Sequence, residues 1–538
     1  MSLPVPFPHI KDVAGDYNPA IRLFGKRFSN EQTIVEYLAE FLAVVFSDKR
    51  IGNGETIESP LPSLEELRKW YDTPDAKLFY KPPIKLNLKL LAFLGISRVD
   101  SRHYIHKKHY ENLINELGKN IKVSGCTIEE VKDWIEDLLR GFQGAGFNRT
   151  WCAQTFYPVS AHLLTQETIW NETVAKKQSV LSWHDTIKDF NKFYSTKKRD
   201  FLSRGGELLY LQLCNVFANR QAAIEDIAKS LGFCSDESNL SKLHRSLQEG
   251  LKELSGRYTA AFERLVDYLE LLDRETHELT DEKTEALVCE WCPEESWLEG
   301  YLFAVEINRL LAAVLDPVER LELLMTGFAL HVLRSLCAQS LRYARGFTGA
   351  TNDTALGYAW IFSPPASSSR QLRLASQRNL QFIQGLIQKS LRSDALQKNA
   401  ARDPRKEKSR LYKEADTKYG HKLFLSLGKK LGMIVPKKGP GARFIMTDKI
   451  LRYLVLVLLR PGERCTYDEF LRRLYYHYGI AIEGKELIGA LNWSGLPANS
   501  SVLPAKGSWL AEMLRAGGFL TELSDACSIV RNTFSKNN

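Results

Sequence analysis

Apolar residues in this chain recur at three- and four-residue spacing almost throughout, which is the pattern of amphipathic helices. Helical patterns cover 208–218, 243–272, 297–314 and 318–344 in near succession. Alternation with a period of two, which is typical of half-buried strands, is nearly absent before residue 430. We therefore expect a mainly α-helical protein, with short β-hairpins in its C-terminal third.

Capping residues locate several of these helices more closely. Ser29 precedes an apolar face over residues 34–45, and Thr127 precedes another that ends at Gly141. A longer pattern over 408–431 stops at Gly432. Each pattern predicts one uninterrupted helix.

The chain is too long for a single small core. At 538 residues, two to four domains are expected. Gly346–Gly357 and the Ser/Pro-rich tract 363–369 indicate a loop or a domain boundary. We predict a helical N-terminal region (1–125), a helical region with a basic-aromatic stretch (126–204) and a helical middle domain (205–362). A basic linker (363–404), a helix with a basic hairpin (405–447) and a winged-helix-like domain (448–538) would follow.

Composition narrows the class of protein. Nine cysteines lie scattered without the spacing of a disulfide framework, which indicates a reducing compartment. The proline-containing start has no apolar core of a signal peptide, and the run Leu454–Leu459 is far too short to cross a bilayer. We expect a cytoplasmic protein without membrane association.

Positive charge is concentrated in one stretch. Residues 370–480 hold 25 Lys and Arg against 9 Asp and Glu, although the whole chain has a net charge of only +9. Residues 263–299 have a net negative charge, with 13 acidic residues against three basic ones. Such segregation usually marks a surface that meets a polyanion, although a well-solvated basic helix would give the same composition.

The C-terminal third carries the clearest structural signal. Two short apolar segments, 433–435 and 444–446, flank a Gly/Pro turn with cations at its tip, which predicts a hairpin after the 408–431 helix. Helices then follow at about 448–458, 466–478, 483–491 and 508–515, and a terminal hairpin spans 519–534. Three helices and a hairpin form the winged helix-turn-helix plan, here with one extra helix.

This arrangement resembles the tandem winged-helix C-terminal halves of accessory proteins in bacterial anti-phage defence gene clusters built around a large helicase or nuclease. The resemblance covers about residues 405–538. It rests on Leu427-Gly428-x-x-Leu431-Gly432-Met433-Ile434-Val435-Pro436, Arg443 and Phe470-Leu471-x-x-Leu474-x-x-x-Tyr478-Gly479. It implies a DNA-handling subunit that works with a helicase or nuclease partner, with the helical front as a docking body. Helix 508–515 carries only Arg515 beside Glu512, so the earlier hairpin is the better DNA candidate.

From these patterns we expect a non-enzymatic protein that binds double-stranded DNA without sequence specificity and needs no cofactor or metal. Cations would contact phosphates, and basic-aromatic stretches at 102–110 and 192–199 could add contacts unless their aromatics pack inward. The candidate nucleic-acid-binding residues are Lys437, Lys438, Arg443, Arg402, Arg405, Lys406, Lys408, Arg410, Lys107, Lys108, Lys197, Lys198 and Arg199.

Two alternatives remain open. Winged helices also dock proteins, so the chain could be a scaffold for the same helicase or nuclease without touching DNA. Asp468, Glu483 and Lys485 have the residue types of a metal-dependent nuclease core, although both carboxylates are expected at helix starts rather than on strands.

Two further features have no clear chemistry in the sequence. Cys289 and Cys292 lack a second ligand pair for zinc, which favours two buried thiols. Glu207 follows a Gly-Gly turn and is either a site residue or a carboxylate at a helix N-terminus. No catalytic residue can be assigned from the sequence.

Overall fold

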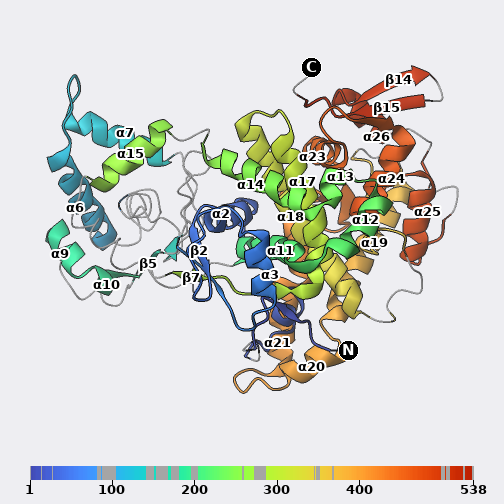
Figure 1. Cartoon of the computed structure of the whole chain (residues 1–538), viewed down its shortest axis with the longest axis horizontal. Helices are drawn as coiled ribbons and strands as arrows, with labels where there is room; N and C mark the ends of the chain where they lie inside the picture. Colours follow the sequence, from blue (N-terminus) through green and yellow to red (C-terminus); the bar gives the residue numbers. More distant parts are fainter. Residues whose placement is uncertain are drawn as a thin grey trace.

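The computed structural model describes residues 2–11, 13, 15–26, 28–81, 87, 104–140, 151–152, 168–170, 181–195, 204–256, 260–271, 286–344, 346, 352–365, 369–498, 503–504, 509–524 and 527–535. This part of the chain is mainly helical, which confirms the expected fold class at that level (Figure 1). Strands are short and form small sheets.

The first half of the chain contributes two groups of elements. The N-terminal elements are β1 (Pro6–Phe7), α1 (Pro19–Phe24), α2 (Ile34–Val45), β2 (Asp48–Ile51), α3 (Leu64–Tyr71) and β3 (Leu78–Lys81). A second group, much of it on the left of Figure 1, comprises α6 (Tyr104–Asn120), α7 (Ile128–Arg140), β4 (Trp151–Cys152), β5 (Thr168–Trp170), α9 (Trp183–Lys188), α10 (Phe190–Phe193) and β6 (Tyr194–Ser195).

The middle of the chain supplies the long core helices. Its elements are α11 (Gly205–Asn219), α12 (Gln221–Leu231), α13 (Ser235–Ser238), α14 (Leu240–Gly256), α15 (Ala260–Leu271), β7 (Leu287–Val288), β8 (Cys292–Pro293), a 3-10 turn (Glu294–Ser296), α17 (Trp297–Ala312), α18 (Pro317–Tyr343) and β9 (Trp360–Ser363).

The C-terminal third alternates helices with short strands. It contains α19 (Arg370–Ser390), α20 (Asp394–Ala400), α21 (Lys408–Glu414), a π turn (Ala415–Tyr419), α22 (His421–Leu431), β10 (Ile434–Val435), β11 (Arg443–Ile445), α23 (Asp448–Leu458), β12 (Arg464–Thr466), α24 (Tyr467–Tyr478), β13 (Ile480–Ala481), α25 (Gly484–Trp493), α26 (Trp509–Ala516), β14 (Leu520–Ser524) and β15 (Cys527–Arg531).

Helix α18 is the centre of the packing. It contacts α2, α17, α19, α22 and α23, and it lies among them in Figure 1. By length and composition it is the one helix of the described ranges apolar enough to cross a membrane, but 89% of its apolar window is buried in the protein. Its hydrophobicity is therefore that of a core helix, and the cytoplasmic location stays a prediction.

Helices α11 and α2 cross very closely because α11 starts with two glycines. A Cβ on Gly206 would lie 2.3 Å from Cβ of Glu40 and 2.5 Å from the carbonyl oxygen of Tyr37. The amide of Gly206 donates to the buried Glu40 carboxylate at 2.8 Å, which places a negative charge at the N-terminus of α11. The Gly-Gly pair thus serves helix packing.

Several sequence predictions need correction. The cap of α2 is Thr33, which forms a capping box with Glu36, and not Ser29. Thr447 caps α23, and Asp448 is the first residue of that helix. The 408–431 pattern is broken by a π turn and by Gly420 into α21 and α22, although its apolar residues remain on the buried side. The 243–272 pattern contains α14 and α15, and residues 257–259 between them lie outside the described residues. The Thr127 start was correct.

Strand β9 was missed altogether. It lies in a four-stranded sheet of order β10-β11-β9-β13, parallel to both β11 and β13, and all four of its residues are buried. The sequence showed there only a short apolar run beside a Ser/Pro tract. One continuous cluster of buried apolar residues extends from Phe7 to Val530, across the predicted domain boundaries, which stay predictions.

A buried polar cluster joins five of the helices. Arg334 of α18 donates two hydrogen bonds, at 2.6 and 2.9 Å, to Glu306 of α17. The same carboxylate also forms hydrogen bonds with Nε2 of His477 of α24, at 2.5 Å, and with the hydroxyl of Tyr453 of α23, at 3.1 Å. Arg334 also donates to Nδ1 of His331, whose Nε2 faces Gln212 of α11 at 2.9 Å. These six residues are called the buried cluster below.

The charges in the buried cluster depend on one another. Burial by itself would raise the pKa of Glu306, but Arg334 and His477 lower it well below the usual range of a carboxyl. Burial lowers the pKa of both His331 and His477 and so disfavours their charged forms. Desolvating both charges makes a buried ion pair of this kind costly to form. Removing only one of the two charged residues destabilises the protein more, because the other charge stays buried without its partner.

We predict that Arg334→Met lowers the free energy of unfolding by about 3–5 kcal/mol, because it leaves a buried carboxylate without its cation. The double variant Glu306→Leu/Arg334→Met should lose less than that single variant, since no buried charge remains. Urea unfolding measures both. The exposed pair Lys449–Glu322 provides the control: Lys449→Met should cost no more than about 1 kcal/mol. An equal effect of Arg334→Met and Lys449→Met would contradict the role of the buried cluster.

Candidate nucleic-acid interface

The outer side of α19 is basic and contains no acidic residue. Over its 21 residues the helix has no Asp or Glu. Its inner side is fixed by Asn379, which donates to the carbonyl of Ala359 at 3.1 Å and accepts from the amide of Ile361 at 2.9 Å. Because this side is held against β9, the cations of α19 point away from the core. These cations are Arg370, Arg373, Arg378 and Lys389.

The hairpin β10–β11 lies beside the first turns of α19. Ile434 and Phe444 are buried, while Lys437 and Lys438 at the tip are exposed. Gly439 and Gly441 in the turn have φ values of 93° and 82°, which favour glycine. Gln377 of α19 donates to the carbonyl of Gly441 at 3.2 Å. The hairpin and α19 therefore form one surface, called the basic surface below.

Arg443 faces Arg373 across this junction. Ser376 of α19 accepts from the amide of Phe444 at 2.9 Å, so the residue before Phe444 lies next to the preceding turn of the helix. Burial, and then the charge of Arg373, lower the pKa of Arg443. The Nε atoms of both arginines are shielded from solvent and have no hydrogen-bond partner in the described structure. Arg373 was not predicted from the sequence.

A second group of cations follows α20 in the chain and extends into the first turn of α21. Arg402, Arg405 and Arg410 are exposed and form no ion pair within the described ranges. Two other predicted residues are engaged: Lys406 pairs with Glu414 at 2.8 Å, and Lys408 lies 3.4 Å from the amide oxygen of Gln397. All five predicted residues are thus exposed, but only the first three are available without breaking a contact.

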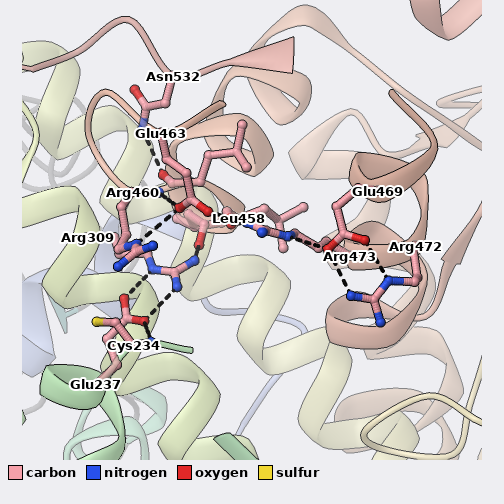
Figure 2. Close-up of polar contacts among 12 residues, drawn as sticks. Cys234, Glu237, Arg309, Leu458, Arg460, Glu463, Glu469, Arg472, Arg473 and Asn532 are labelled. Carbon is pink, nitrogen blue, oxygen red and sulfur yellow. Dashed lines mark hydrogen bonds and ion pairs between the residues drawn. The ribbon is translucent and has the colours of Figure 1, made fainter. Parts of the chain in front are cut away.

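Five of the six cations over residues 448–478 form ion pairs within the protein, and Arg464 forms none in the described ranges. Lys449 and Arg452 of α23 pair with Glu322 and Glu319 of α18. Figure 2 shows the other three paired cations: Arg460 pairs with Glu463, Arg473 lies between Glu463 and Glu469, and Arg472 pairs with Glu469. In the same view Arg309 of α17 binds Glu237 of α13. Arg309 also donates to the carbonyl of Val457. The basic half of the chain is therefore divided into a paired part and an unpaired part.

The acidic stretch is also partly internal. Glu294 binds Arg220 and Tyr71, Glu299 binds Arg342, and Glu290 binds Arg204. Three acidic residues of the stretch 263–299 therefore pair with cations of the helical body. The structure describes 263–271 and 286–299 of this stretch, and residues 272–285 lie outside the described residues.

The two basic-aromatic stretches have different outcomes. Lys108 of α6 is exposed, and His109 is buried against Phe193 with ring centroids 5.3 Å apart. Burial lowers the pKa of His109 to about 4. This is the arrangement with aromatics inward and cations outward. The side chain of Lys107 and the residues Lys197, Lys198 and Arg199 lie outside the described residues.

Neither Cys289, Cys292 nor Glu207 forms an open site. Both cysteines are buried and unbridged, and burial raises the pKa of the Cys292 thiol. Glu207 is buried in the first turn of α11 and accepts a hydrogen bond from Tyr80. In the described part of the chain no group of three His, Cys, Asp or Glu side chains is arranged to hold a metal ion.

An open pocket of about 650 Å³ lies where α24 and α25 begin. Asp468, Glu483 and Lys485 line it, so the structure brings together the three residues of the nuclease-like pattern. Glu486 also lines it and was not predicted. Its position three residues after Glu483, near the start of a helix, was the available signal. Burial raises the pKa of Glu486, and the carboxylate of Asp468 acts in the same direction.

Comparisons with protein-family models, with curated proteins and with solved structures found no match to this chain. The function must therefore be argued from the surfaces themselves.

We predict that Glu486→Gln stabilises the protein at pH 7 and not at pH 4. The folded state disfavours ionisation of this carboxyl, so the ionised wild type loses stability as the pH rises above the usual pKa of a glutamate. Thermal unfolding at both pH values measures the difference. Glu512→Gln on the exposed side of α26 is the control and should change the melting temperature little at either pH. A destabilising effect of Glu486→Gln at pH 7 would contradict the prediction.

Proposed function

We propose that this chain binds DNA through the basic surface, as a non-enzymatic subunit of a bacterial anti-phage defence complex. The observation that carries the proposal is the set of unneutralised cations on α19 and its hairpin. Arg370, Arg373, Arg378, Lys437, Lys438 and Arg443 have no ion-pair partner in the described ranges, whereas the cations of α23 and α24 mostly do. A surface that keeps cations unpaired is suited to a polyanion.

The connectivity of the C-terminal elements supports winged-helix modules. From α23 onward the order is helix, strand β12, helix α24, strand β13, helices α25 and α26, then hairpin β14–β15; β12 pairs with β15, and β13 pairs with β9. We infer from this order a winged helix with one inserted helix. The preceding α22 with β10–β11 would be its partner module, whose hairpin leans on β9.

The two modules differ in the charge that they offer. The cation of α26, Arg515, pairs with Glu522, which leaves that helix without a free positive charge in the described structure. The terminal module is then the one that docks the helicase or nuclease, and the hairpin of the preceding module is the one that meets double-stranded DNA. Contacts to phosphates alone would give binding without sequence specificity.

The test is fluorescence anisotropy of labelled double- and single-stranded DNA over a range of salt concentrations. The wild type should bind with an affinity that falls steeply with salt. Lys437→Glu/Lys438→Glu should weaken binding and reduce the slope of log K against log salt by about 2, since two phosphate contacts are lost.

The matched control is Lys122→Glu/Lys229→Glu, which changes the net charge equally on exposed lysines of other elements. It should leave the slope unchanged. A wild-type chain without affinity for DNA would sink the proposal and favour the alternative, a scaffold that docks its partner through both modules. That scaffold would form a salt-resistant complex with the partner.

The pocket at α24 and α25 is the observation that favours a second candidate, a metal-dependent nuclease. Its carboxylates lie at helix starts, and Glu483 interacts with Tyr467, which weakens this candidate. We expect no Mg²⁺-dependent cleavage of plasmid DNA by the purified chain. Cleavage that is lost in both Asp468→Asn and Glu483→Gln would establish the nuclease instead; cleavage that persists in both would point to a contaminant.

A further inference from the structure

Arg373 and Arg443 lie close enough for the positive charge of Arg373 to lower the pKa of Arg443, and neither forms an ion pair in the described ranges. The two hydrogen bonds that fix the hairpin on α19, from Gln377 to Gly441 and from Phe444 to Ser376, lie on either side of Arg443. One turn earlier on the same helix stands Arg373. The elements that carry both arginines are thus held in place by neighbouring contacts, so the arginines cannot separate freely.

Several buried or half-buried arginines elsewhere bind carboxylates with both ends of the guanidinium fork. Arg309, Arg334, Arg342 and Arg392 each bind a carboxylate with two nitrogens. Arg373 and Arg443 have none in the described ranges, and the Nε of each is shielded without a partner. Unsatisfied donors on two neighbouring guanidinium groups are what an oxyanion with several acceptor oxygens would complete.

We propose that Arg373 and Arg443 form a clamp for a single phosphate group, and that in DNA binding this phosphate is a backbone phosphodiester. That the phosphate belongs to DNA rests on the proposed function; that the two arginines bind a phosphate does not. The tip lysines Lys437 and Lys438 lie beyond the clamp on the same hairpin. They supply point charges that hold the neighbouring part of the backbone, while the arginines fix the register.

The clamp has a consequence for stability that distinguishes it from a merely structural pair. Two like charges held together oppose folding when no anion is bound. Arg373→Gln and Arg443→Gln should therefore melt at the same temperature as the wild type or higher in low-salt buffer without phosphate. Inorganic pyrophosphate at low millimolar concentration should raise the melting temperature of the wild type, because it binds only the folded state.

The experiment combines thermal unfolding with pyrophosphate and anisotropy with a DNA duplex. Both single variants should lose the pyrophosphate-dependent rise and bind the duplex at least about tenfold more weakly. Arg402→Gln/Arg405→Gln, on the other group of exposed cations, should keep the full rise. Arg443→Lys retains the charge but not the fork of donors, so it should recover only part of the rise.

The outcomes separate the two proposals. A wild-type rise with pyrophosphate that persists in both glutamine variants, or no rise at all, overturns the clamp. Duplex binding that is insensitive to Arg373→Gln and Arg443→Gln but lost in Lys437→Glu/Lys438→Glu also overturns it, and leaves the DNA proposal standing. A clamp that binds pyrophosphate in a chain with no affinity for DNA supports the clamp and assigns it to a free phosphorylated ligand, and the DNA proposal then fails.

Discussion

The arrangement of this protein depends on one buried carboxylate. Glu306 lies in the middle of α17 and receives hydrogen bonds from α18, α23 and α24 at once, and the chain of contacts continues through His331 to α11. No apolar contact could fix five helices so specifically, because apolar side chains can slide or repack at small cost. A charged centre with directional partners permits one register. The C-terminal third is thereby tied to the helical body rather than tethered to it.

The position of the basic surface is fixed relative to the buried cluster through α18 and β9. Helix α19 packs on α18. The side chain of Asn379 forms hydrogen bonds with the backbone of Ala359 and Ile361, at β9, and with the hydroxyl of Ser494. Strand β9 in turn pairs with β11, the inner strand of the hairpin. The hairpin is consequently braced on a sheet, whereas the wing of an isolated winged helix has one free edge. A rigid position is what a phosphate clamp needs, since its two guanidinium groups must reach one ligand together.

The sequence predicted the helices well because their signals are local. Apolar spacing and caps such as Thr127 and Thr466 act over a few residues, and the structure has helices where those signals occur. Strand β9 could not be found in this way, since it is four residues long and obtains its hydrogen bonds from segments more than 80 residues later. The break at Gly420 was hidden for the opposite reason: the π turn keeps the apolar side continuous, so the period of the pattern barely changes.

The candidate site was only half visible for a related reason. Exposed cations such as Lys437 and Lys438 can be recognised from a Gly/Pro turn, and they are exposed as expected. Whether a cation is neutralised depends on tertiary contacts, so Arg472 and Arg473 looked equivalent to Arg373 in the sequence although their charges are used internally. The missing acids over 370–390 were the one signal that pointed to α19.

This division of charge gives the strongest physical reason to treat the two ends of the basic stretch as different surfaces. If the whole stretch were simply a solvated basic region, cations would be paired or unpaired without regard to position. Instead the cations of α23 and α24 pair with acids of α18 and of their own segment, whereas those of α19 and its hairpin form no ion pair within the described ranges. Leaving like charges unpaired works against the folded state, and acidic side chains at a few positions of α19 would remove that cost. A chain that neutralises Arg473 twice and leaves Arg373 close to Arg443 without an acid fits the proposed binding of an external anion.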